Sequence, residues 1–260
     1  MREVAVVVRN DNIGVNAIET IDAIKKAGFR NVFIQWYNES WIPTQEEQLK
    51  YIKSQNLNVI FAHLGYRKVN NIWVEGNEGE KVVEEYKNDI KMCKKNNIPM
   101  VVMHLTLGLN PPELNYLGIK RLQEIADYAK ELDIKIAFEN VEVKGSLEYV
   151  LENIKNENVG ICFDVGHNHV FFDDQLDLTK FKDKIFAVHF HDNDKTADLH
   201  LLPFDGTLNW ENVIKNVKVN NYNGPVTLEP CYNYDYLNNS VEQFYDKAFD
   251  IGKRLSLMFE

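Results

Sequence analysis

Eight short apolar runs, each followed by a longer amphipathic stretch, recur along the whole sequence. The runs are rich in Val, Ile, Phe and Met and occupy residues 3–8, 31–36, 58–63, 99–104, 134–139, 159–164, 185–190 and 225–229. Such runs are typical of parallel strands that are buried on both faces. Eight strand–helix units predict an α/β fold of the (β/α)8 TIM barrel type. The alternative is an open doubly wound sheet, but no glycine-rich phosphate turn follows the first run.

Several helix ends can be predicted from single residues. Residues 15–27 place isoleucines on one face, and Gly28 follows at the position of a C-terminal cap. Ser146 and Asn209 are expected to cap two later helices at their N-terminal ends. The sixth unit is the weakest, because its helical signal is confined to LDLTKFK at 176–182.

Length, charge and cysteine content limit the class of protein. A chain of 260 residues is ordinary for one barrel, so residues 1–260 are expected to form a single domain. The formal net charge of −10 argues against a protein that binds nucleic acid through its phosphates. The N-terminal apolar run is too short for a signal peptide or a membrane span. Three widely spaced cysteines indicate reduced thiols and a cytoplasmic protein, and Cys162 is expected in the core.

Six of the eight runs end in a side chain that can bind a metal or carry a proton. These residues are His63, His104, Glu139, Asp164, His189 and Glu229. Any one of them alone is more often a structural residue, a helix cap or an ion-pair partner. In a barrel, however, the carboxyl ends of all strands converge on the face where active sites lie. Buried imidazoles and carboxylates are costly unless a cation compensates them, and this donor mixture suits Mn, Zn, Fe or Co better than Ca.

Longer motifs surround these residues. They are AFEN around Glu139, CFDVGH from Asp164 to His167, VHFHDND around His189, DLH from Asp198 to His200, FDGTLNW at 204–210 and TLEP around Glu229. As an ordered set, they resemble the xylose isomerase-like TIM barrel superfamily, which holds sugar isomerases, sugar 3-epimerases and endonuclease IV. The motifs are specific for the superfamily and much less specific for one of its members.

The resemblance implies two alternative metal sites. In the sugar epimerases, one divalent metal is held by Glu, Asp, His and Glu at the ends of strands five to eight, which match Glu139, Asp164, His189 and Glu229. In endonuclease IV, a three-zinc cluster has nine ligands, and all nine have a match here: the same four residues with His63, His104, His167, Asp198 and His200. The epimerase residue that matches His167 contacts the substrate instead.

Two histidines at the end of the seventh strand, His189 and His191, are candidates for the metal ligand, because residues two apart on a strand point to the same face. His189 is preferred as the ligand because its V-H-x-x-D-N pattern then matches the family. His191 is expected either to support the metal ligands from behind or to lie at the rim. Asn140 and Asn193 are expected to orient the ligands.

The epimerase-like interpretation is favoured over the nuclease-like one. It predicts a divalent-metal-dependent isomerase or epimerase of a sugar or sugar phosphate, acting by proton transfer through a metal-stabilised enediolate, with Glu139 and Glu229 as the catalytic acid–base pair. Mn or Zn is the expected metal, with Mg or Co as alternatives. The main alternative is an endonuclease IV-like zinc phosphodiesterase. A non-enzymatic binding barrel has no positive support.

Expected partners follow from the same interpretation. The substrate is a small sugar, and the acidic net charge and the scarcity of basic strand-end loops disfavour nucleic acid. No membrane partner is expected, and the family resemblance allows a homodimer. Trp36 and Tyr37 are candidates to stack on a sugar face, with packing at the barrel rim as the alternative. Arg9 and Lys195 are candidates to bind the substrate, and Lys195 stands where epimerases carry an arginine.

Overall fold

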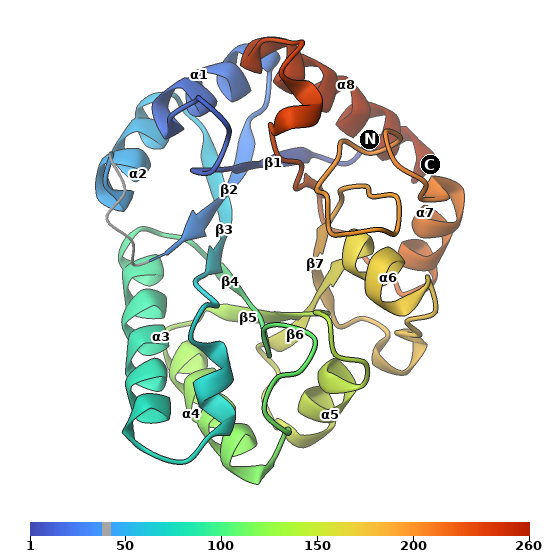
Figure 1. Cartoon of the computed structure of the whole chain (residues 1–260). Helices are drawn as coiled ribbons and strands as arrows, with labels where there is room; N and C mark the ends of the chain where they lie inside the picture. The colour runs from blue at the N-terminus through green and yellow to red at the C-terminus, as the bar shows by residue number, and fades with distance from the viewer. Residues whose placement is uncertain (38–42) are drawn as a thin grey trace.

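The computed structural model describes residues 1–37 and 43–260, and it confirms the barrel predicted from the sequence. Eight parallel strands lie side by side in the order β7-β6-β5-β4-β3-β2-β1-β8, with helices around the outside (Figure 1). The two ends of this sheet meet at Phe190, whose N–H donates to the Thr227 carbonyl at 2.9 Å. The Phe190 carbonyl accepts the N–H of Glu229 at 3.0 Å. These bonds nearly close the barrel.

The strands coincide with the eight apolar runs to within one residue at either end. They are β1 (Val4–Val8), β2 (Asn31–Trp36), β3 (Asn58–Leu64), β4 (Met100–Met103), β5 (Lys135–Glu139), β6 (Val159–Asp164), β7 (Ile185–His189) and β8 (Val226–Leu228). The α-helices are α1 (Ala17–Ala27), α2 (Gln45–Ser54), α3 (Asn77–Lys95), α4 (Tyr116–Glu131), α5 (Ser146–Asn153), α6 (Val165–Phe172), α7 (Trp210–Val219) and α8 (Val241–Met258). Short 3-10 turns are η1 (Val69–Trp73), η2 (Thr179–Phe181) and η3 (Tyr234–Tyr236).

Helix caps agree with the sequence in two of the three positions predicted. Gly28 ends α1 at a φ of 105°, a left-handed conformation that glycine adopts without strain. The side chain of Asn209 accepts the N–H of Asn212 at 3.0 Å and so caps α7. The prediction for Ser146 was wrong, because the cap of α5 is Gly145. Ser146 is already helical and donates its hydroxyl to the carbonyl of Val143 at 2.8 Å.

The sixth helix includes His169, as expected for the segment after the sixth strand, and it does not extend to LDLTKFK at 176–182. α6 begins directly after β6, and segment 176–182 forms only the short turn η2. The carboxylate of Asp164 accepts the N–H of His167 at 2.6 Å, which starts the helix at the last residue of the strand. The sequence of α6 shows no amphipathic pattern because its polar residues are buried along with its apolar ones.

Apolar side chains form two layers, one between the strands and the helices and one inside the barrel. The inner layer takes one residue from each of β1 to β7: Val7, Phe33, Phe61, Val102, Ala137, Cys162 and Ala187. Cys162 is fully buried there, as predicted. Because this layer fills the interior, the polar residues at the carboxyl ends of the strands lie directly above an apolar region. Among the helices described, none has the length and apolar character needed to cross a membrane.

Candidate metal centre

Glu139, the last residue of β5, is surrounded by imidazoles from four other parts of the chain. Its Oε2 lies 3.0 Å from Nε2 of His63 and 3.1 Å from Nε2 of His104. Its Oε1 lies 2.9 Å from Nδ1 of His189 and 3.7 Å from Nδ1 of His167. Burial alone would raise the pKa of Glu139, but the imidazoles of His189 and His104 hold it well below its ordinary value. Glu139 is therefore ionised at neutral pH.

Asp164, at the junction of β6 and α6, contacts the imidazole of His191 and also that of His189, which it shares with Glu139. Nε2 of His191 lies 3.0 and 3.1 Å from its two carboxylate oxygens, and Nδ1 of His189 lies 3.6 Å from Oδ2. Burial opposes ionisation, but His167 and His191 keep the pKa of Asp164 well below its ordinary value. The side chain of Asn140 accepts the Asp164 N–H and donates to the Asp164 carbonyl, each at 2.8 Å. Asn140 therefore fixes the backbone from which this carboxylate projects.

Glu229 follows β8 and is joined to Glu139 through one imidazole. Nδ1 of His189 lies 3.1 Å from Oε2 of Glu229 and 2.9 Å from Oε1 of Glu139. Burial raises the pKa of Glu229, and His189 more than offsets this, so that the pKa falls to about 2. On the other side, Nδ1 of His200 lies 2.8 Å from the Glu229 carbonyl oxygen. The two glutamates thus reach one site from β5 and β8.

A third group of donors comes from the loop between β7 and α7. Oδ2 of Asp198 lies 3.2 Å from Nε2 of His167 and 3.1 Å from Nε2 of His200. The His200 ring stacks on His191, with ring centroids 4.1 Å apart. The structure therefore brings together all nine residues matched to a three-zinc cluster, and it adds His191 to them.

These side chains fit a divalent cation. Groups of three offer one nitrogen or oxygen each within 4.8 Å of one another, among them His63–His104–Glu139, Asp164–His167–His191 and His191–Asp198–His200. Four buried atoms of the cluster have no hydrogen-bond partner within residues 1–37 and 43–260: His104 Nδ1, His189 Nε2, His191 Nδ1 and Asp198 Oδ1. Buried polar atoms are seldom left unpaired unless a ligand or ion completes them. Imidazole nitrogen together with carboxylate oxygen suits Zn, Mn, Fe or Co.

His189 and His191 lie at different depths in the barrel. The ring of His189 lies nearly parallel to that of Phe33 in the inner apolar layer, with centroids 5.2 Å apart. His191 is fully buried between Asp164 and Asp198, so of its two expected places the rim is excluded, and the one beside a ligand agrees with its contact to Asp164. The reason is that Phe190 pairs with β8, and this pairing carries the chain inward beyond the end of β7.

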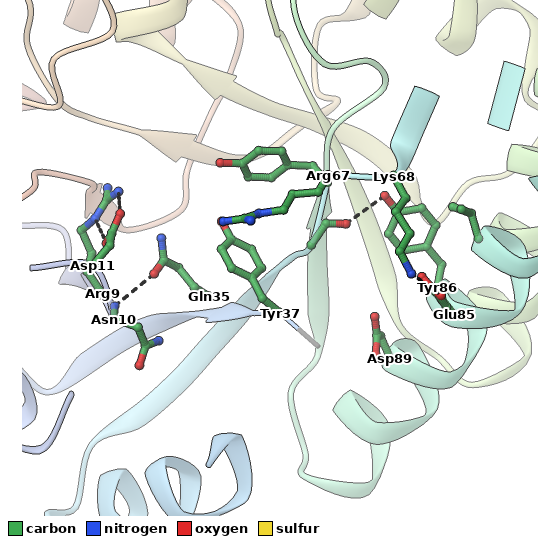
Figure 2. A pocket seen from close by; sticks show the side chains of 13 residues that line it. Arg9, Asn10, Asp11, Gln35, Tyr37, Arg67, Lys68, Glu85, Tyr86 and Asp89 are labelled. Carbon is green, nitrogen blue, oxygen red and sulfur yellow. Dashed lines mark hydrogen bonds and ion pairs between the residues drawn. The ribbon is translucent and has the colours of Figure 1, made fainter. Parts of the chain in front are cut away.

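Two cavities adjoin the cluster. One of about 60 Å³ is lined by Glu139 and Glu229 among others, and a larger one of about 330 Å³ lies beside it. The side chains that line both cavities are Arg9, Gln35, Tyr37 and Tyr66. Figure 2 shows the larger cavity, with Arg9 at one side of it. Arg9 is therefore placed where it can reach a molecule bound at the cluster.

Two candidate substrate-binding residues lie elsewhere. Trp36 is buried between the strands and the helices, and its Nε1 donates to Oδ1 of Asp89 at 3.2 Å. Its neighbour Tyr37 lines both cavities instead. Lys195 forms an ion pair with Asp173 at the end of α6 and lines neither cavity. Arg9 therefore remains a candidate to bind the substrate, and of the two aromatic candidates it is Tyr37, not Trp36, that lines the cavities.

Sequence reasoning missed two residues that shape the site. The Tyr66 ring stacks on the ring of His104, with centroids 4.1 Å apart and planes 9° apart. Gln35, on β2, accepts the backbone N–H of Asn10 at 3.2 Å. Both lie at or just beyond the carboxyl end of a strand, so the positional rule that identified His63 would also have found them.

The loop that carries Asp198 and His200 is held by the buried carboxylate of Asp192. Its oxygens accept the N–H of Phe204 at 3.0 Å, the N–H of Leu208 at 3.0 Å and the indole N–H of Trp210 at 2.8 Å. These bonds explain the FDGTLNW motif, whose backbone and tryptophan wrap around this one side chain.

Asp192→Ala is expected to lower the free energy of unfolding by about 3 kcal/mol or more, because two buried donors and one partly buried donor lose a charged acceptor. Metal retained by the protein should fall as well, since the loop supplies two of the candidate ligands. Urea denaturation and elemental analysis check both effects. Asp194→Ala is the matched control, because Asp194 is exposed on the same loop and its carboxylate accepts the N–H and the hydroxyl of Thr196. Equal stability of the two variants would contradict the assignment.

Comparison with known proteins supports the fold. An inosose isomerase from Halalkalibacterium halodurans is 22% identical over 261 residues, covering 90% of this chain and 89% of that protein. A protein named "Probable endonuclease 4" from Mycoplasma capricolum subsp. capricolum is 30% identical over 148 residues, covering 49% of this chain and 50% of that protein. The chain spans 50% to 60% of the length of several curated relatives that it matches, this endonuclease included.

A solved structure and a family model cover nearly the whole chain. The D-psicose 3-epimerase of Clostridium cellulolyticum H10 superimposes with a TM-score of 0.76 at 14% identity, covering 99% of both chains. At that identity the likeness is one of fold. The family model described as xylose isomerase-like TIM barrel matches residues 21–250, which include all the strand ends from β2 to β8. The chain therefore belongs to the xylose isomerase-like TIM barrel family.

Proposed function

We propose that this protein is a divalent-metal-dependent isomerase or epimerase of a sugar. The observation that carries the proposal is the pair Glu139 and Glu229, which face one small cavity from β5 and β8. Two carboxylates on either side of a substrate carbon are what proton removal and return require. The inosose isomerase and the D-psicose 3-epimerase that resemble this chain support the same class of reaction.

Four residues would hold the ion in this proposal: Glu139, Asp164, His191 and Glu229. We assign His191 because its Nε2 lies 3.0 and 3.1 Å from the two carboxylate oxygens of Asp164. His189 is a positioning residue, because its Nδ1 is already shared between the two glutamates. The ion, when bound, supplies a Lewis acid beside the substrate carbonyl.

The two glutamates differ in how many of their carboxylate oxygens contact imidazoles, and we assign them different roles on that basis. Both oxygens of Glu139 face imidazoles, through Oε2 to His63 and His104 and through Oε1 to His189. The imidazole contacts of Glu229 in the described part of the chain run through Oε2. Glu229 Oε1 is therefore the better placed atom to take a proton from a substrate carbon, and Glu139 is the more strongly held ligand.

Removal of metal is expected to abolish activity without unfolding the barrel. Protein purified without chelator should contain about one Mn, Co, Mg or Zn per chain and should isomerise or epimerise members of a panel of ketoses. Treatment with EDTA should remove that activity, and the added metal should restore it. Elemental analysis, circular dichroism and sugar chromatography are the measurements. Full activity in protein shown to be free of metal would contradict the proposal.

A zinc phosphodiesterase is the second candidate, and one observation favours it. The residues matched to the three-zinc cluster of endonuclease IV all meet here, including His63, His104 and the group of Asp198 with His167 and His200. The endonuclease 4 relative supports this reading over the shared segment. The net charge of −10 opposes it, because DNA binding needs several phosphate contacts from basic residues.

Metal count and substrate separate the two candidates. Two or three zincs per chain, with cleavage of abasic DNA or of a simple phosphodiester, would establish the second candidate. One metal per chain with turnover of a ketose and no cleavage of either phosphodiester would establish the first.

A further inference from the structure

The larger cavity lies beside the metal centre and is built by four segments. Arg9 and its neighbours follow β1, Gln35 and Tyr37 come from the end of β2, and residues 65–68 follow β3. The fourth wall is the side of α3, through Glu85 and other residues in the middle of that helix. Figure 2 shows these walls around the cavity. A substrate whose reacting carbons lie at Glu139 and Glu229 would extend into this space.

The charges of the described residues that line the cavity balance. Three basic residues, Arg9, Arg67 and Lys68, face three acidic ones, Asp11, Glu85 and Asp89. Arg9 is held by Asp11 through two bonds of 2.8 Å, from Nε to Oδ1 and from Nη2 to Oδ2. Lys68 Nζ lies 2.7 Å from Glu85 Oε1. The described part of the lining therefore has no net charge with which to attract an anion.

Among the described residues that line the cavity, none belongs to the N-terminus of an α-helix, which is a common phosphate site. Phosphates are commonly bound at a helix N-terminus, where backbone N–H groups and the helix dipole point at them. Here the cavity meets the side of α3 at Val82, Glu85 and Asp89, well inside the helix Asn77–Lys95. A phosphate dianion in this space would lie near the carboxylates of Glu85 and Asp89, and like charges repel.

Two buried donors remain for a ligand. Arg9 is 7% exposed, and its Nη1 has no hydrogen-bond partner in the part of the chain that the structure describes. The same holds for Nδ2 of Asn10, whose Oδ1 already accepts Gln48 Nε2 at 2.7 Å. Hydroxyl and carbonyl oxygens accept bonds from such donors. The rings of Tyr37, Tyr66 and Tyr86 supply apolar surface for the C–H faces of a sugar.

We infer that this cavity binds an uncharged, hydroxyl-rich part of the substrate, so that the sugar turned over at the metal centre carries no phosphate. The inference rests on the proposed isomerase or epimerase function for the position of the reacting carbons. It adds the class of substrate, a free sugar or cyclitol long enough to reach from the metal centre to Arg9 and Asn10.

Calorimetric binding to the metal-loaded protein tests the inference. The probes are free ketohexoses, each paired with its 6-phosphate. The phosphates are expected to bind about tenfold more weakly or worse. Glu85→Gln removes one carboxylate and releases Lys68. It should therefore reduce the preference for the free ketohexose over its 6-phosphate by about fivefold. Glu84→Gln, on the exposed side of the same helix, should leave the preference unchanged. Tighter binding of the phosphates, or no binding of any free ketohexose, would overturn the inference.

A second variant separates binding in the cavity from structural damage. Asn10→Ala should lower kcat/KM for a ketohexose about tenfold and leave that for a ketotetrose unchanged, because the shorter sugar does not reach this donor. Equal losses for both sugars would count against the inference. If free ketoses bind but are not isomerised, the proposed function is contradicted, while the inference that the cavity binds an uncharged sugar is kept. If sugar phosphates are turned over faster than free sugars, the proposed function is kept and the inference is contradicted.

Discussion

Glu139→Gln is expected to abolish turnover while the barrel stays folded. The amide has the shape of the carboxylate but cannot balance the imidazoles of His63, His104 and His189, which lie within about 3 Å of its oxygens. It is also a poor metal ligand and cannot accept a proton. We expect kcat to fall by a factor on the order of 10²–10⁴ and the metal content to fall with it. Steady-state kinetics and elemental analysis are the measurements.

Two companion variants make this result interpretable. Glu131→Gln, at the exposed end of α4, makes the same chemical change away from the site and should behave as the wild type. Glu229→Gln should lose a comparable part of kcat and retain more metal, because fewer imidazoles surround Glu229 than Glu139 among the described residues. Full activity of Glu139→Gln or of Glu229→Gln would show that these carboxylates are not the acid–base pair.

Gly166→Ala is expected to displace His191 from the metal centre. A Cβ at Gly166 would lie 2.0 Å from Cε1 of His191, far inside van der Waals contact. The backbone cannot yield easily, since Asp164 caps α6 and the side chain of Asn193 donates to the Gly166 carbonyl at 2.9 Å. We expect the free energy of unfolding to fall by about 1–3 kcal/mol, and activity by about 10-fold to 100-fold. Urea denaturation and kcat/KM measure the two effects.

A double-mutant cycle identifies the cause of the Gly166→Ala effect. If the clash with the imidazole destabilises the protein, adding Gly166→Ala to His191→Ala should cost far less stability than adding it to the wild type. The coupling energy is then most of the single-variant loss. Strict additivity of the two stability losses would show that the alanine acts on something other than His191.

The elements that the sequence predicts well are those set by local pattern. Each strand of the barrel is a continuous apolar run, and each run ends where polar residues begin, so both its existence and its limits are visible in the sequence. Because the carboxyl ends of barrel strands meet on one face, the sequence alone predicts that His63, His104, Glu139 and Asp164 converge.

The elements that the sequence predicts poorly depend on contacts between distant segments. His191 lies inside the cluster because Phe190 pairs with β8, and no local pattern reveals that pairing. Trp36 and Tyr37 are adjacent aromatics, and only the register of β2 decides which faces the cavity. Lys195 forms an ion pair with Asp173, which is distant from it in the sequence, and it lies outside both cavities.

Most histidines of this protein lie at one end of the barrel, so their NMR signals report on the metal centre without an added label at the site. The chain has seven histidines, and six of them contact the carboxylates of the cluster. The seventh, His169, is held apart by Asp174 and Thr207 at 2.9 Å each. The imidazole ¹⁵N resonances of uniformly labelled protein therefore report almost entirely on this one site, because protonation, tautomer and metal binding each shift them. His169 supplies an internal reference, so a titration with each metal would count the occupied positions one by one.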